Sequence, residues 1–349
     1  QGIVDAVIHV GRASDQDDLF QYTISSDRES LTARRKSQYY PTTLRDVLET
    51  ARLSGQRHAL VGVPCFIKAA RLLCREDPTL EAAIPFFVGL VCGHMKTRFF
   101  AESLAWQMGI APTELAAVDF RIKNPARKSS DYDFGAKRRG EQEYVQRRTQ
   151  TLIGGNWGHG AFQPEACNFC DDVFAETADV VFGDAWLPRF KDDWRGTNVV
   201  VSRNEEIDRI LQGGAASGAI ELESIGVDEA AQSQAGGFRH RRDGLAVRLA
   251  DDLSAGLSVP KKRVRPDPNR SGGGRRALIH QRRAMSELSL ESFAEARAGQ
   301  DLDTYLRPMR AAIARYRRLE VSALARTVSG VVRRVSRHLF RLRRFRSSL

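Results

Sequence analysis

The sequence predicts an α/β fold in which a mixed or mostly parallel sheet is flanked by helices and followed by a basic helical extension. Short apolar runs rich in Val and Ile alternate with stretches whose apolar residues recur at helical spacing. Runs of the first kind are typical of strands buried on both faces, and the stretches between them suit helices that cover the sheet. The composition agrees, because 42% hydrophobic and 28% charged residues are usual for a soluble globular protein.

The expected elements follow in chain order. The expected strands share an apolar core bounded by turn residues: Val4–Val10, His58–Val63, Pro85–Val91, Leu115–Ile122, Ala178–Phe182 and Asn198–Ser202. The expected helices share one apolar face: Thr43–Ser54, Ile67–Cys74, Lys96–Met108 and Glu205–Gln212. The segment Arg127–Arg148 is polar and weakly periodic, so we expect a mobile excursion that could act as a lid.

Charge divides the chain into three parts. Residues 1–259 are expected to form the α/β body, 260–274 a basic linker rich in Pro and Gly, and 275–349 a basic amphipathic helical tail. From Lys261 to the end there are 23 Lys and Arg against 7 Asp and Glu. Apolar residues recur at helical spacing among the arginines of the tail: Val321, Leu324, Val328, Val331, Val335, Leu339, Leu342 and Phe345.

Three partners would suit such a tail: an anionic membrane surface, nucleic acid or an acidic partner subunit. We favour the membrane surface or the partner subunit, because no aromatic stacking platform or base-reading motif accompanies the charges. The longest apolar stretch, residues 84–92, is far shorter than the ~20 residues that cross a bilayer. Five cysteines are unlike a secreted disulfide scaffold, so we expect a cytoplasmic protein, peripheral at the inner membrane surface if the tail binds lipid.

Four of the five cysteines follow or precede expected strands, where an iron–sulfur cluster could bind them. Cys65 and Cys92 follow two strands, and Cys167 and Cys170 form a CxxC pair just before another. The pair alone is also compatible with half of a zinc site or with a redox disulfide, and Cys65 and Cys92 could be buried core thiols. Cys74 lies on the apolar face of an expected helix and is assigned to the core.

Other candidate residues carry weaker signals. Asp184 ends an apolar strand, where an open α/β sheet often places a ligand-facing carboxylate, although turn capping is equally common there. Arg121 and Lys123 could bind an anionic part of a cofactor, although solvated edge charges are the commoner case. His94 and His159 could each donate a proton, although a surface or capping role is the commoner case, and the loop at Trp157 could cover a flat ring.

Taken together and in this order, six motifs resemble the beta-subunit family of coenzyme F420 hydrogenases and dehydrogenases. The motifs are Ser37-Gln-Tyr39, Gly62 to Cys65, Cys92-Gly93, Phe120 to Lys123, Cys167 to Cys170 and Ala178 to Trp186, and the resemblance covers roughly residues 2–249. It implies an oxidoreductase that carries FAD and a 4Fe-4S cluster and passes electrons to coenzyme F420, a ferredoxin or a redox partner subunit. The chain opens at Gln1 directly with a strand-like run, so we expect it to lack the family's N-terminal part.

The resemblance also implies roles for individual residues. Thiolate ligands of the cluster would be Cys65, Cys92, Cys167 and Cys170. The flavin or deazaflavin pocket would be lined by Ser37, Tyr39, Arg121, Lys123 and Asp184. The alternative from another class is a zinc-stabilised α/β binding protein whose basic tail docks on an anionic membrane or on nucleic acid.

Overall fold

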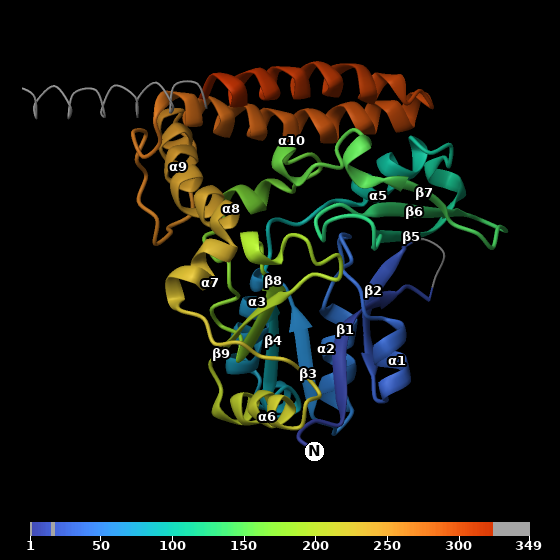
Figure 1. Cartoon of the computed structure of the whole chain (residues 1–349), viewed down its shortest axis with the longest axis vertical. Helices are drawn as coiled ribbons and strands as arrows, with labels where there is room; N and C mark the ends of the chain where they lie inside the picture. Colours follow the sequence, from blue (N-terminus) through green and yellow to red (C-terminus); the bar gives the residue numbers. More distant parts are fainter. Residues whose placement is uncertain (1, 15–17, 324–349) are drawn as a thin grey trace, which may run out of the picture.

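The computed structural model describes residues 2–14 and 18–323. Its main feature is a six-stranded sheet with the order β2-β1-β3-β4-β8-β9 (Figure 1). The strands are β1 (Ala6–Arg12), β2 (Phe20–Ser25), β3 (His58–Gly62), β4 (Phe86–Leu90), β8 (Val180–Asp184) and β9 (Asn198–Ser202). The four central strands are parallel, and the edge strands β2 and β9 run antiparallel to their neighbours. The predicted α/β class with a mostly parallel sheet is confirmed.

Helices α1 (Arg28–Ala33), α2 (Arg45–Leu53), α3 (Pro64–Glu76), α4 (Pro78–Ala83) and α6 (Glu205–Ala216) cover this sheet. Three later helices follow, α7 (Val227–Ser233), α8 (Ala235–Phe238) and α9 (Gly244–Ser254), and α9 packs on α10 (Gly273–Gly299). One hydrophobic cluster joins the sheet to α2, α3 and α4, and Leu60 and Phe87 of the strands pack there with Leu48 and Ile67 of the helices. Burial of these apolar side chains fixes the strand order and therefore the edge at which the loops after β3 and β4 meet.

A second, antiparallel sheet lies in the chain between β4 and β8. It consists of β5 (Leu115–Ile122), β6 (Asp133–Arg138) and β7 (Val145–Arg148), preceded by α5 (Arg98–Trp106). The expected strand Leu115–Ile122 therefore exists but belongs to a separate sheet. The expectation that residues 127–148 form a mobile lid is wrong, because they contain two paired strands. The polar composition of residues 127–148 is explained by ion pairs such as the one between Arg127 Nη2 and Asp133 Oδ2 (2.5 Å).

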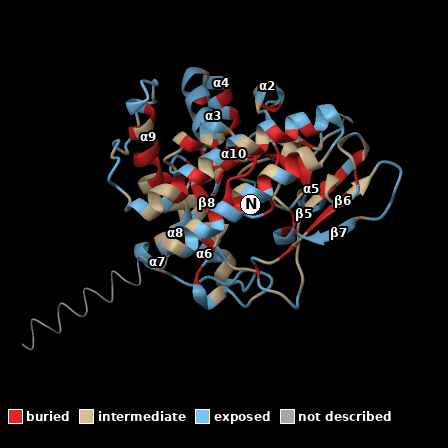
Figure 2. Cartoon of the chain, turned by 90° about the horizontal axis from the view of Figure 1, so that it is seen from above, coloured by how far each residue is buried: buried red, intermediate tan, exposed pale blue. Residues whose placement is uncertain are grey.

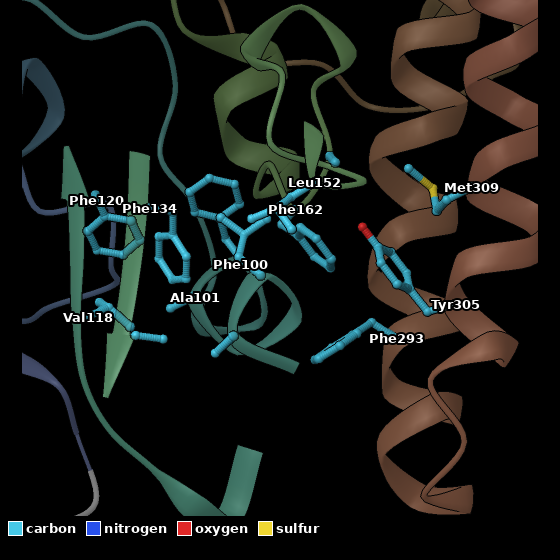
Figure 3. Close-up of a cluster of buried hydrophobic side chains, with 14 of the residues drawn as sticks. Phe100, Ala101, Val118, Phe120, Phe134, Leu152, Phe162, Phe293, Tyr305 and Met309 are labelled. Atoms are coloured by element: carbon cyan, nitrogen blue, oxygen red, sulfur yellow. The ribbon is translucent and has the colours of Figure 1, made fainter. Parts of the chain in front are cut away.

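The C-terminal helices pack against α5 and the loop at residues 157–162. Helix α10 (Gly273–Gly299) and helical residues 303–323 lie side by side across one end of the molecule (Figure 1). Their inner faces are buried and their outer faces exposed (Figure 2). Phe293 and Tyr305 pack with Phe100 and Phe162 in the larger hydrophobic cluster (Figure 3). The helical region expected after residue 274 thus begins inside the core of the folded body.

Between α9 and α10 the described chain contains no helix or strand, as the Pro- and Gly-rich composition suggests. Val321 is 68% exposed. The remaining residues of the predicted amphipathic tail, Leu324 to Phe345, lie outside the described residues, and so the predicted binding of this tail to membrane, nucleic acid or partner stays a prediction. No helix within the described residues is both long enough and apolar enough to cross a membrane.

Candidate functional site

The four candidate thiols lie around one edge of the main sheet. Cys65 is the second residue of α3, directly after β3, and Cys92 follows the neighbouring parallel strand β4. The loop with Cys167 and Cys170 reaches the same edge, because the backbone N–H of Cys92 donates to the carbonyl oxygen of Val173 at 3.5 Å. Carboxyl ends of parallel strands meet at one edge, so the topology brings the three loops together. Cys74 is buried in the core between the sheet and α3, as expected.

The four thiols affect one another electrostatically. Burial raises the pKa of Cys65, and the neighbouring charges of Cys167 and Cys170 raise it further. Burial raises the pKa of Cys92 to about 12, with Cys167 and Cys65 again acting in the same direction. Within the described ranges, no three Cys, His, Asp or Glu side chains are arranged so that they could hold a metal ion. The thiols are therefore neighbours, but in this conformation they do not form a preassembled ligand set.

A buried arginine faces these thiols. Arg241 is 1% exposed and lies on a π-helical turn, Arg239–Asp243, a feature often found at functional sites. Its guanidinium donates to the carbonyl oxygens of Gly93 (3.1 Å) and Asp172, so it joins the two loops that carry the thiols. It also hydrogen-bonds the thiol of Cys92 and opposes the rise in that thiol's pKa. Burial lowers the pKa of Arg241, and the charges of Cys92 and Cys170 raise it. Arg241 in turn opposes the rise that burial causes in the pKa of the Asp172 carboxyl, although no described carboxylate forms an ion pair with Arg241.

Trp157 connects the thiol loops to a second cluster. Its ring centroid lies 4.5 Å from that of His94 and 4.7 Å from that of Tyr39. The ammonium of Lys96 lies 4.8 Å from the same ring and donates to the carbonyl oxygen of Ala161. Burial holds the pKa of Lys96 well below its usual range, and the nearby Arg282 charge adds to this effect. The two groups of predicted site residues therefore share one aromatic wall.

The five residues predicted to bind a flavin or deazaflavin form that second cluster. Arg121, on β5, donates to Asp184 at the end of β8 (2.9 Å) and to the hydroxyl of Ser37 (3.5 Å). Burial raises the pKa of Tyr39, while the Arg121 charge lowers it and the Asp184 charge raises it. Burial lowers the pKa of Lys123, as does the Arg121 charge. Residues far apart in the sequence thus converge on one ion pair.

The chemistry of this cluster suits a flat, conjugated ligand. The Arg121 guanidinium lies 5.1 Å from the Tyr132 ring centroid, and its charge acts on the Tyr39 hydroxyl. Aromatic faces stack on a conjugated ring, and a guanidinium can bind its electron-rich atoms. The thiol cluster offers soft donors beside the Arg241 cation, which suits an anionic iron–sulfur group.

Several residues of the site could not be predicted from their local sequence. Arg241 occurs in a run of arginines that resembles a solvated surface, and Tyr132 lies in the segment expected to be mobile. A surface position for His94 and His159 is wrong, since these side chains are only 4% and 6% exposed. Burial lowers the pKa of His159 to about 4, and it lowers that of His94 still more strongly relative to its ordinary value.

Comparison with family models identifies two matches in this chain. Residues 55–227 match the C terminus of the coenzyme F420 hydrogenase/dehydrogenase beta subunit, and residues 1–49 match the N-terminal part of the same subunit. All nine predicted site residues lie within the two matched ranges. The expectation that the chain lacks the family's N-terminal part is not borne out, because residues 1–49 match it.

A solved structure supports the fold. A chain of the F420-reducing [NiFe] hydrogenase complex from Methanosarcina barkeri is similar, with a TM-score of 0.51 and 15% sequence identity. The similarity covers 74% of this chain and 84% of that chain. At this identity the likeness concerns the fold alone. A search of the curated proteins gave no match.

Proposed function

Since the chain belongs to the coenzyme F420 hydrogenase/dehydrogenase beta-subunit family and is an oxidoreductase subunit, we propose that it carries electrons through a flavin and an iron–sulfur cluster. The observation that carries this proposal is the shared wall at Trp157. Its ring contacts Tyr39 of the Arg121–Asp184 cluster and also His94, two residues after Cys92. Adjacent cofactor sites are what a two-electron carrier and a one-electron carrier need in order to exchange electrons.

We propose that the thiolates of Cys65, Cys92, Cys167 and Cys170 hold a 4Fe-4S cluster. The donor set supports this, because four thiols surround one region and thiolates are the usual ligands of such clusters. Arg241 would compensate the negative charge of the thiolates and hold the loops at Gly93 and Asp172 together. The alternative, a zinc-stabilised binding protein, would use the same thiols, and metal analysis separates the two.

We propose that Ser37, Tyr39, Arg121, Lys123 and Asp184 bind FAD or coenzyme F420. A bound flavin accepts a pair of electrons as hydride and can release them one at a time. The protein's part is to hold the ring. Tyr39 and Trp157 would supply aromatic surface, and Arg121, oriented by Asp184, would donate hydrogen bonds to electron-rich ring atoms. The electron carrier outside this chain would be coenzyme F420, a ferredoxin or a redox partner subunit.

Anaerobic purification tests the proposal. We expect a brown protein with about four iron and four sulfide ions per chain, together with flavin that is released on denaturation. Reduced coenzyme F420 and reduced ferredoxin, supplied separately to the purified chain, should differ in how fast they bleach the bound flavin, and the faster one identifies the carrier. Zinc in place of iron, or iron-free protein after anaerobic work, would contradict the proposal.

A further inference from the structure

A cavity outside this site is lined mainly by cationic side chains. It lies among α9, α10, the helical residues 303–323 and the π-helical turn, and it opens to solvent. Its titratable lining consists of His240, Arg248, Arg275, Arg282, Arg283 and Tyr316. None of the described residues that line it is acidic.

One of these arginines is already neutralised. Arg283 forms ion pairs with Asp252 and Glu165, each at 2.6 Å. Within the described chain, Arg248, Arg275 and Arg282 form no ion pair with a carboxylate. Residues 324–349 contain neither Asp nor Glu. Three guanidinium groups therefore line one cavity without an ion-pair partner among the described carboxylates.

The remaining contacts do not compensate this charge. Arg248 is 2% exposed and donates to the carbonyl oxygens of Asn168 (2.9 Å) and His240 (3.1 Å). Arg282 contacts Nδ1 of His94 at 3.2 Å. Burial and the neighbouring cations lower the pKa of Arg248 to about 9. These contacts satisfy single N–H groups. The charges of Glu165 and Asp252 oppose the lowering of the Arg248 pKa, but neither carboxylate forms an ion pair with Arg248.

Unsatisfied donors complete the case for a ligand. His240 is 6% exposed, and its Nε2 has no hydrogen-bond partner among the residues that the structure describes; the same holds for Nε of Arg282. Buried polar atoms without partners cost free energy, and neighbouring cations add repulsion. A bound oxyanion would remove both costs at once, because its oxygens accept several hydrogen bonds and its charge opposes that of the arginines.

We propose that this cavity binds a phosphoryl group through Arg248, Arg275 and Arg282, with His240 as a further hydrogen-bond partner. Planar guanidinium groups match the oxygen geometry of phosphate, which favours it over a spherical anion. Apart from Asn168, the lining residues lie beyond residue 227 and so outside both family matches. The site would thus be a property of this chain's C-terminal helices, and it does not depend on the proposed electron transfer.

Isothermal titration calorimetry of the full chain at fixed ionic strength tests this inference. The probes are inorganic phosphate and, in a second arm, AMP, which carries the same group on a larger molecule. We expect saturable binding of one phosphoryl group per chain. Tighter binding of AMP would assign the group to a nucleotide-like ligand, and binding of phosphate alone would assign it to the free ion.

Variants locate the binding. Arg248→Met should weaken phosphate binding about tenfold, or about 1.4 kcal/mol. Arg248 also holds two carbonyl oxygens, so Arg275→Gln, at the start of α10, is the second variant and should weaken binding several-fold. The matched control is Arg276→Gln, whose guanidinium pairs with Asp251 away from the cavity lining and which should bind as the wild type does. The inference is overturned if millimolar phosphate gives no saturable heat, or if Arg275→Gln binds phosphate as tightly as Arg276→Gln.

Discussion

Replacing Phe293 by Ala tests whether the C-terminal helices are part of the body's core. Phe293 is 0% exposed on α10, and its ring centroid lies 5.2 to 6.0 Å from those of Phe99, Trp106, Phe162 and Tyr305. Truncation of a buried Phe costs about 3–5 kcal/mol. Since four rigid rings surround Phe293, the cavity that the substitution leaves cannot close easily. We therefore expect Phe293→Ala to lower the free energy of unfolding by about 4 kcal/mol.

Urea unfolding followed by circular dichroism and by tryptophan fluorescence measures this loss. Both signals should shift together to lower urea, because the rings that Phe293 contacts belong to α5, to the loop at Phe162 and to the C-terminal helices. Val321→Ala is the control: its side chain is 68% exposed, so the change should stay within about 0.5 kcal/mol. The shared core would be refuted if Phe293→Ala lowered the free energy of unfolding by less than about 1 kcal/mol. It would also be refuted if the variant showed a separate unfolding transition at low urea while the main transition stayed unchanged.

Two further predictions concern the site and its surroundings. Asp184→Asn and Arg121→Met should each destabilise the protein. Because the ion pair between these side chains is largely shielded from water, a double-mutant cycle should give a coupling energy of about 2 kcal/mol. Additive effects of the two substitutions would mean that the ion pair contributes nothing to stability. Burial lowers the pKa of His159 to about 4 in the folded protein. Between about pH 6.5 and pH 4 the unfolded state therefore binds more protons than the folded state. The free energy of unfolding consequently decreases as the pH falls through this range. Urea titrations at pH 7 and pH 4 measure the difference in unfolding free energy between the two pH values, and His159→Gln should reduce this difference by about 2 kcal/mol. The same difference in the variant and the wild type would show that His159 is not buried in its neutral form.

The strands of the parallel sheet could be predicted because their signal is local. Asn198–Ser202 forms β9 as expected, and β3 ends one residue before the predicted boundary at Val63. Strands β6 and β7 could not be predicted in the same way, because their charged residues pair across the sheet and hide the apolar alternation. The packing of α10 was also hidden, because its arginines dominate the composition while Phe293 and Met285 face the core.

The candidate site was predictable to the extent that topology decides it. Cys65 and Cys92 follow adjacent parallel strands, so their meeting at one edge follows from the strand order. Arg241 could not be found, because it lies 148 residues from Gly93 in the sequence and only tertiary packing brings its guanidinium to that carbonyl oxygen. Trp157 was expected only to cover a ring, and its contacts with both His94 and Tyr39 emerge from the fold.

Iron and sulfide analysis of Cys65→Ser beside Cys74→Ser tests the central claim most directly. Both cysteines lie on α3, but Cys65 stands at the sheet edge with the other thiols and Cys74 is buried in the core. After anaerobic purification, we predict that Cys74→Ser keeps the iron and sulfide content of the wild type and that Cys65→Ser loses most of both. Equal iron and sulfide in the two variants would contradict the proposed cluster.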